Sequence, residues 1–96
     1  MLIPKSFQLF GTTYQVKQLP KVIYNGESVL GKYVPDTYTI EIRKNLKKQM
    51  KQEVYLHELM HAILLTLQYK KLGWDETFIE RTSKALHQAI TTSKYE

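Results

Sequence analysis

The hydrophobic pattern of this chain changes its period near residue 45. Before that point, Tyr38, Ile40 and Ile42 alternate with polar residues, which is typical of a strand with one buried face. After it, the segment from Leu46 to Leu67 becomes apolar on nearly all sides, which predicts a long helix in the middle of its domain, ending near Gly73. Strands followed by helices indicate an α+β fold.

Residues 6–42 predict three or four antiparallel strands. A strand pair is expected to turn at Gly11, and Asn25-Gly26 is the strongest two-residue hairpin signal in the chain. The segment Thr37 to Ile42 forms the last strand. With 96 residues and no repeat, low-complexity tract or linker, residues 1–96 are expected to form a single domain.

A second, C-terminal helix is predicted after Gly73, with Asp75 or Thr77 as its N-cap. Trp74 is expected to cover the junction of the two helices, and a wall of the substrate pocket is the less favoured interpretation of this residue. The apolar face that we expect to meet the core contains Phe78, Thr82, Ala85, Leu86 and Ala89. A polar stripe beside it, which could face the rim of a cleft, contains Glu76, Glu80, Ser83 and His87.

The composition excludes some classes of site and partner. The chain has no cysteine, so disulfides and thiolate metal clusters are ruled out, whereas a metal held by histidine and carboxylate is not. The net charge of +5 decides nothing alone. The most apolar stretch, Leu59 to Leu67, is about half the roughly 20 residues that a membrane-spanning helix needs. We expect a cytoplasmic protein without membrane or export segment.

The central helix contains His57-Glu58-Leu59-Met60-His61, the H-E-x-x-H pattern. Residues four apart lie about 40° apart around a helix, so both imidazoles can reach one ion, while Glu58 is turned about 100° from His57. Glu58 can then accept a proton from water beside the ion instead of ligating it. The pattern predicts a zinc site in which Glu58 is the general base.

A catalytic zinc usually has three protein ligands, so a third must come from the second helix. The candidates are Asp75, Glu76, Glu80 and His87. Glu80 is favoured because it follows His61 by 19 residues, enough for a helix to end, turn at Gly73 and return. Glu76 remains an alternative if that turn is tight.

The run from Val54 to Ile63 resembles the active-site helix of zincin metallopeptidases, and residues 75–80, with Ala85 and Leu86, resemble the glutamate helix of gluzincins. The chain is most similar to compact phage and bacterial proteins related to the ImmA/IrrE family of metallopeptidases. This resemblance covers about residues 40–86. It implies a minimal zincin fold in the cytoplasm of a bacterial or phage-infected cell, with Zn²⁺ held by His57, His61 and Glu80.

The same resemblance implies that Glu58 is the general base and that an edge strand, Thr37 to Ile42, borders the cleft and pairs with an extended peptide. Larger gluzincins carry a further histidine or tyrosine that stabilises the oxyanion formed during hydrolysis, and no motif identifies such a residue here. Tyr33, Tyr38 and His87 are possible. Larger members also have a second lobe, which 96 residues cannot supply.

Three functions follow, in order of preference. The first is a zinc metalloendopeptidase that hydrolyses a peptide bond in a protein or peptide substrate. The second is a zinc-stabilised binding module, catalytically weak or inactive, that acts on a regulatory, phage or host protein. The third is a nucleic-acid binder that uses the lysines at 44, 47, 48 and 51 as a phosphate track; a solvated helix face explains them better, so nucleic acid is not expected as a partner.

Overall fold

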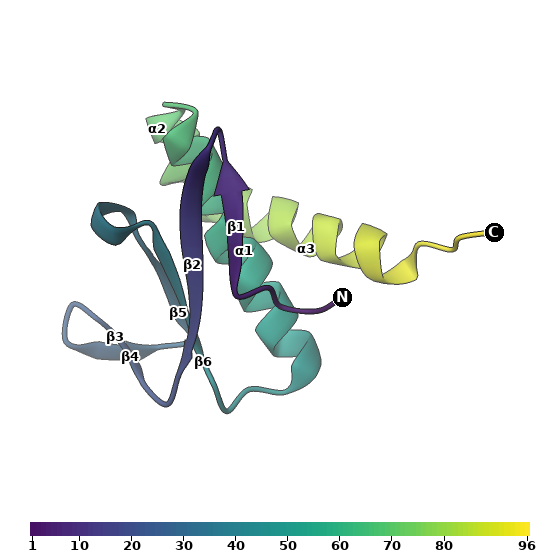
Figure 1. Ribbon diagram of the computed structural model, residues 1–96, viewed down its shortest axis with the longest axis horizontal. Coiled ribbons are helices and arrows are strands. Elements are labelled where there is room, and N and C mark those ends of the chain that lie inside the picture. The colour runs from purple at the N-terminus through teal and green to yellow at the C-terminus, as the bar shows by residue number, and fades with distance from the viewer.

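The computed structural model describes residues 1–96 and has the α+β architecture expected from the sequence. Its strands are β1 (Ser6–Leu9), β2 (Thr12–Leu19), β3 (Val22–Tyr24), β4 (Glu27–Val29), β5 (Gly31–Val34) and β6 (Thr39–Arg43), and its helices are α1 (Lys48–Thr66), α2 (Lys70–Gly73) and α3 (Glu76–Thr92), with a 3₁₀ turn at Pro35–Thr37. The main sheet packs on α1, and α3 packs on α1 and extends away from the strands (Figure 1).

The main sheet is mixed, with strand order β1-β2-β6-β5. β1 pairs antiparallel with β2, and β5 pairs antiparallel with β6, but β2 and β6 are parallel. The expectation of a purely antiparallel sheet was therefore wrong at one pairing. The chain leaves β2, forms β3 to β5, and comes back beside β2 in β6. β5 runs opposite to both β2 and β6, so the chain reverses direction twice before β6 pairs parallel with β2.

The segment Thr37 to Ile42, expected at the edge, lies inside the sheet instead. β6 starts at Thr39 and has β2 on one side and β5 on the other. Its core residues Ile40 and Ile42 are completely buried, as the alternating pattern predicts. The two edge strands are β1 and β5; β5 packs along α1, whereas β1 reaches it through Phe7, which packs edge-to-face on Tyr55.

The hairpin of β3 and β4 forms where Asn25-Gly26 predicts it. Both turn residues have positive φ, 51° at Asn25 and 79° at Gly26, as a type I′ turn requires. Two side chains tie this hairpin to the main sheet: Lys32 Nζ donates to the Ile23 carbonyl at 2.7 Å, and the Arg43 guanidinium donates to Ser28 Oγ at 2.7 Å.

The central helix ends earlier than the apolar pattern suggests. α1 ends at Thr66, and Gln68 then adopts the left-handed conformation with φ 69°, which stops the helix. The short helix α2 follows and leads to α3, whose N-cap is Asp75. Its Oδ1 accepts a hydrogen bond from the Phe78 amide at 3.0 Å, as expected for a capping aspartate.

The face of α3 that packs on α1 is the polar stripe and not the apolar one. The buried residues of α3 are Ile79, Ser83 and His87, whereas the predicted core face (Phe78, Thr82, Ala85, Leu86, Ala89) is half-buried or exposed. The reason lies in α1, which presents polar partners: His87 Nε2 lies 2.9 Å from Gln52 Oε1. Buried polar groups need such partners, so the stripe is oriented by hydrogen bonding.

The hydrophobic core lies between the sheet and α1. It contains Val16, Ile40, Ile42, Val54, Tyr55 and Leu56. The 19 residues of α1 therefore bury one side on the sheet and another on α3, consistent with a helix in the middle of its domain. None of the helices combines the length and the apolar character that crossing a membrane requires.

Candidate metal centre

The two histidines of the H-E-x-x-H pattern lie one turn apart on α1, with ring centroids 5.1 Å from each other. His61 is buried, and the His57 side chain is one-fifth exposed. Their Nε2 atoms meet the same carboxylate: Glu76 Oε2 lies 3.2 Å from His57 Nε2, and Glu76 Oε1 lies 3.1 Å from His61 Nε2. Glu76 is the first residue of α3, so α3 brings the carboxylate to the pair.

His57, His61 and Glu76 could hold a metal ion, because their ligand atoms all lie within 4.8 Å of one another. Around a tetrahedral zinc with bonds of about 2.0–2.1 Å, neighbouring ligand atoms are about 3.3 Å apart. Each contact of Glu76 with an Nε2 atom is close to that spacing, and the two contacts use different oxygens of the carboxylate: Oε2 lies 3.2 Å from His57 and Oε1 lies 3.1 Å from His61. Two imidazoles and one carboxylate are also a donor set that zinc accepts.

The opposite nitrogens of both rings are held by acceptors. His61 Nδ1 lies 2.6 Å from the Gly73 carbonyl oxygen, which can only accept, so Nδ1 carries the hydrogen and a neutral His61 leaves Nε2 free. His57 Nδ1 lies 3.0 Å from Glu80 Oε2 and is held in the same way. Ligating histidines are oriented by such contacts, which select the tautomer and raise the basicity of the other nitrogen.

Glu80, the third zinc ligand that the sequence favoured, reaches Nδ1 of His57 and not the Nε2 atoms, and its second oxygen accepts from Lys84 Nζ at 2.9 Å. This hydrogen bond from Lys84 holds the pKa of Glu80 below its usual range. The geometry favours Glu76, the alternative in the sequence, as third ligand and Glu80 as the group that orients His57.

Glu58 is placed beside this group and not in it. Its side chain is almost fully buried, with 8% of the residue exposed. Burial raises the pKa of the Glu58 carboxyl to about 7, while His57 and the Tyr33 backbone amide oppose the rise and Glu76 adds to it. A carboxyl group in this range can both take up and release a proton near neutral pH.

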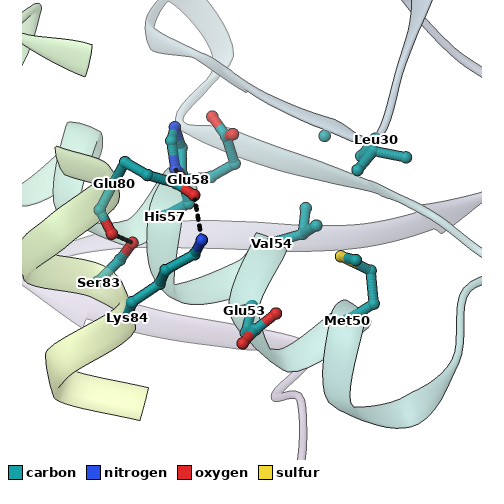
Figure 2. A pocket seen from close by; sticks show the side chains of 10 residues that line it. Leu30, Met50, Glu53, Val54, His57, Glu58, Glu80, Ser83 and Lys84 are labelled. Atoms are coloured by element: carbon teal, nitrogen blue, oxygen red, sulfur yellow. Dashed lines mark hydrogen bonds and ion pairs between the residues drawn. The ribbon is translucent and has the colours of Figure 1, made fainter. Parts of the chain in front are cut away.

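Two cavities flank His57 and Glu58, and both are bordered by Gly31 at the start of β5. The first, of about 370 Å³, lies between Leu30, just before β5, the α1 residues Met50 and Val54, and α3 (Figure 2). The second, of about 450 Å³, reaches the β3–β4 hairpin and is lined by Tyr24, Tyr33 and Trp74 together with His61 and Glu76. The site is thus open on both sides of Glu58.

The three oxyanion candidates are placed differently. Tyr33 lines the second cavity with Glu58, and burial raises the pKa of its phenol to about 12. Tyr38 lies away from both cavities and packs edge-to-face on Tyr14. His87 is buried against Gln52 and does not reach the His57–His61 pair. Only Tyr33 is near enough to Glu58 to line the same cavity.

Two contributions to the site could not be found from side-chain motifs, and a third, that of Trp74, was the less favoured interpretation of its residue. The Gly73 carbonyl acts through the backbone, and Gly31 acts by the absence of a side chain. Trp74 packs its ring 5.8 Å from that of His61 and lines the second cavity, in addition to its place between the helices. In the sequence, the only signals for this part of the site were a glycine at the end of a helix, Gly73, and the aromatic residue beside it, Trp74.

The chain matches no protein-family model, no curated protein and no solved structure in the comparisons made. The function must therefore be argued from the site itself.

Proposed function

We propose that this protein is a zinc-dependent peptidase that hydrolyses a peptide bond with Glu58 as general base. The observation that carries the proposal is the pair of Nε2 atoms directed at Glu76 with a buried carboxyl, Glu58, beside them. A purely structural metal site has no need of such a neighbouring carboxyl. The donor set and the held Nδ1 atoms fit zinc.

A bound zinc ion would supply a Lewis acid that polarises a carbonyl group and brings the pKa of water to about 7. Glu58 takes a proton from water at this place and transfers it to the leaving nitrogen. In the metal-free protein burial raises the pKa of Glu58 to about 7, and a zinc ion held beside it would lower this pKa and favour the carboxylate that accepts the proton. Glu80 and the Gly73 carbonyl keep His57 and His61 in place.

A peptide is the substrate that the neighbouring sheet edge favours. β5 is an edge strand beside α1, and the Arg43 amide donates to the Leu30 carbonyl at 2.8 Å. In an antiparallel pair the backbone groups alternate between the partner strand and the opposite side, so those of Gly31 and Tyr33 point away from β6. The Tyr33 amide on that side hydrogen-bonds the Glu58 carboxyl, which leaves the Gly31 groups and the Tyr33 carbonyl for a peptide. An extended peptide that adds to this edge passes Glu58.

The alternative is a zinc-stabilised binding module without peptidase activity. It is favoured by one observation: Tyr38 and His87, two of the three oxyanion candidates, are turned to packing positions. Such a module would occupy a protein partner through the same cavities and sheet edge.

Metal analysis of the purified protein tests the site. We expect about one zinc per chain in the wild type and in His87→Ala, which removes a buried histidine outside the group. Zinc should be lost in His57→Ala, His61→Ala and Glu76→Ala. Glu80→Ala should retain zinc with weaker affinity, by about 10- to 100-fold, because it only orients His57. Loss in Glu80→Ala with full retention in Glu76→Ala would reverse the assignment.

Glu58→Gln tests the chemistry. The substitution keeps shape and removes the basic oxygen, so zinc content should be unchanged while hydrolysis of a susceptible peptide falls by about 10²–10⁴. Wild-type and Glu58→Gln protein are incubated with a proteome-derived peptide mixture, and new termini are identified by mass spectrometry. If neither protein cleaves while both hold zinc, the binding module replaces the peptidase.

A further inference from the structure

We propose that the cavity of about 370 Å³ beside Glu58 binds a lysine or arginine side chain of the substrate, with its stem on Leu30 and Met50 and its cationic end at Glu53. This inference rests on the proposed peptidase function, because it identifies the substrate class of the same site.

The walls of this cavity are partly aliphatic. Leu30, from the turn before β5, and Met50 and Val54, on α1, line the side that faces away from Glu80 (Figure 2). Leu30 is 40% exposed and Met50 is 42% exposed, so both leave apolar surface open to solvent at the mouth. Covering such surface with a methylene chain is favourable at roughly 25 cal/mol per Å². Lysine and arginine carry chains of this kind.

Three carboxyl groups line the cavity: Glu80 is paired with Lys84 and Glu58 is assigned to proton transfer, which leaves Glu53 for a ligand. Lys84 Nζ lies 2.9 Å from Glu80 Oε1, and this pair neutralises itself (Figure 2). No lysine or arginine lies within ion-pair distance of Glu53, although Lys84 interacts with it at longer range. Its one ion-pair contact is His87 Nδ1 at 3.9 Å, which depends on a protonated imidazole. The carboxylate of Glu53 is only about one-quarter exposed and stands near Met50 (Figure 2).

An amphipathic lining selects an amphipathic side chain. A leucine side chain would cover Leu30 and Met50 but leave Glu53 without a partner, and an acidic side chain would be repelled by it. A lysine or arginine side chain can cover Leu30 and Met50 with its methylene groups and pair its cationic end with Glu53. Because His57 and Glu58 line the same cavity, the bound side chain belongs to a residue next to the cleaved bond.

The test uses a set of quenched fluorescent peptides that differ at one position flanking the scissile bond, carrying Lys, Arg, Leu or Glu. Cleavage is measured with zinc-loaded wild-type protein. Binding of the same peptides, labelled at one end, is measured by fluorescence anisotropy with zinc-loaded Glu58→Gln protein, which requires no cleavage. We expect Lys and Arg peptides to exceed the Leu peptide by about three- to tenfold in both assays, with Glu weakest.

Three variants separate the contributions. Glu53→Gln should remove the preference for Lys and Arg while leaving the Leu peptide unchanged. Met50→Ala, which shortens the apolar wall at a half-exposed position, should weaken binding of the Lys, Arg and Leu peptides alike. Glu27→Gln, an exposed carboxylate on the β3–β4 hairpin that lines neither cavity, is the matched control and should change nothing.

The two proposals fail separately. A binding preference without cleavage supports the basic subsite and overturns the peptidase. Cleavage with Leu preferred over Lys, or a preference that Glu53→Gln does not alter, overturns the subsite and leaves the peptidase standing.

Discussion

Gly31→Ala should destabilise the protein through one steric contact. Gly31 has no positive φ, so only the space around it requires glycine. A Cβ there would lie 2.5 Å from Val54 Cγ1, 3.0 Å from the Glu41 carbonyl oxygen and 3.5 Å from Glu58 Cγ. Val54 is a buried β-branched residue on α1 and cannot rotate freely, and Glu41 O is backbone of β6, so β5 must move away from α1.

The expected cost follows from overpacking, which typically lowers the free energy of unfolding by about 1–3 kcal/mol. For a domain of this size, each kcal/mol lowers Tm by about 4–8 °C. Urea and thermal denaturation of the chelator-treated protein measure the loss without a contribution from metal. Because Gly31 borders Glu58, the same displacement would widen the gap between the edge strand and Glu58.

A double-mutant cycle with Val54→Ala identifies the contact. Removing Cγ1 should recover about 1 kcal/mol or more of the loss caused by Gly31→Ala, so the two changes should not be additive. Gly26→Ala is the control: it is strained by its φ of 79° but has nothing within 4 Å of the added Cβ. Its cost should add to that of Val54→Ala. Additivity in both cycles, or a Gly31→Ala protein as stable as wild type, would refute the steric reasoning.

Three further outcomes are expected. In chelator-treated protein, the Glu58 pKa of about 7 lies above its ordinary 4.5, so wild-type stability should fall as pH rises between these values. The Glu58→Gln protein should not show this fall. Its free energy of unfolding should exceed that of the wild type by up to about 3 kcal/mol at pH 8 and by nothing at pH 4, as measured by urea denaturation at both pH values. Tyr14→Phe removes a 2.6 Å hydrogen bond between buried Tyr14 and Thr66 and should cost about 1 kcal/mol by urea denaturation; an unchanged midpoint would contradict this. Zinc at 100 times its Kd should stabilise the wild type by about 2.7 kcal/mol in a thermal melt, and Glu76→Ala should show no such shift.

Local patterns were sufficient for much of the architecture. The type I′ turn at Asn25-Gly26 and the Asp75 cap involve backbone groups within three residues, so local chemistry specifies them. The spacing of His57 and His61 likewise places two imidazoles on one side of any helix. For the same reason Glu58 had to lie beside the pair.

Long-range packing decided the rest. Glu76 and Glu80 share one face of α3 a single turn apart, about 5–6 Å, so periodicity cannot say which of them meets the two Nε2 atoms. That choice depends on where α1 ends and how α2 sets the start of α3. The parallel pairing of β6 with β2, and the burial of the polar stripe of α3 in place of its apolar one, also arise from contacts between distant segments. The repeat of strands and helices predicts which side chains share a face, because it depends only on the local backbone. Which element packs against that face depends on contacts between distant segments, so only the assembled fold determines it.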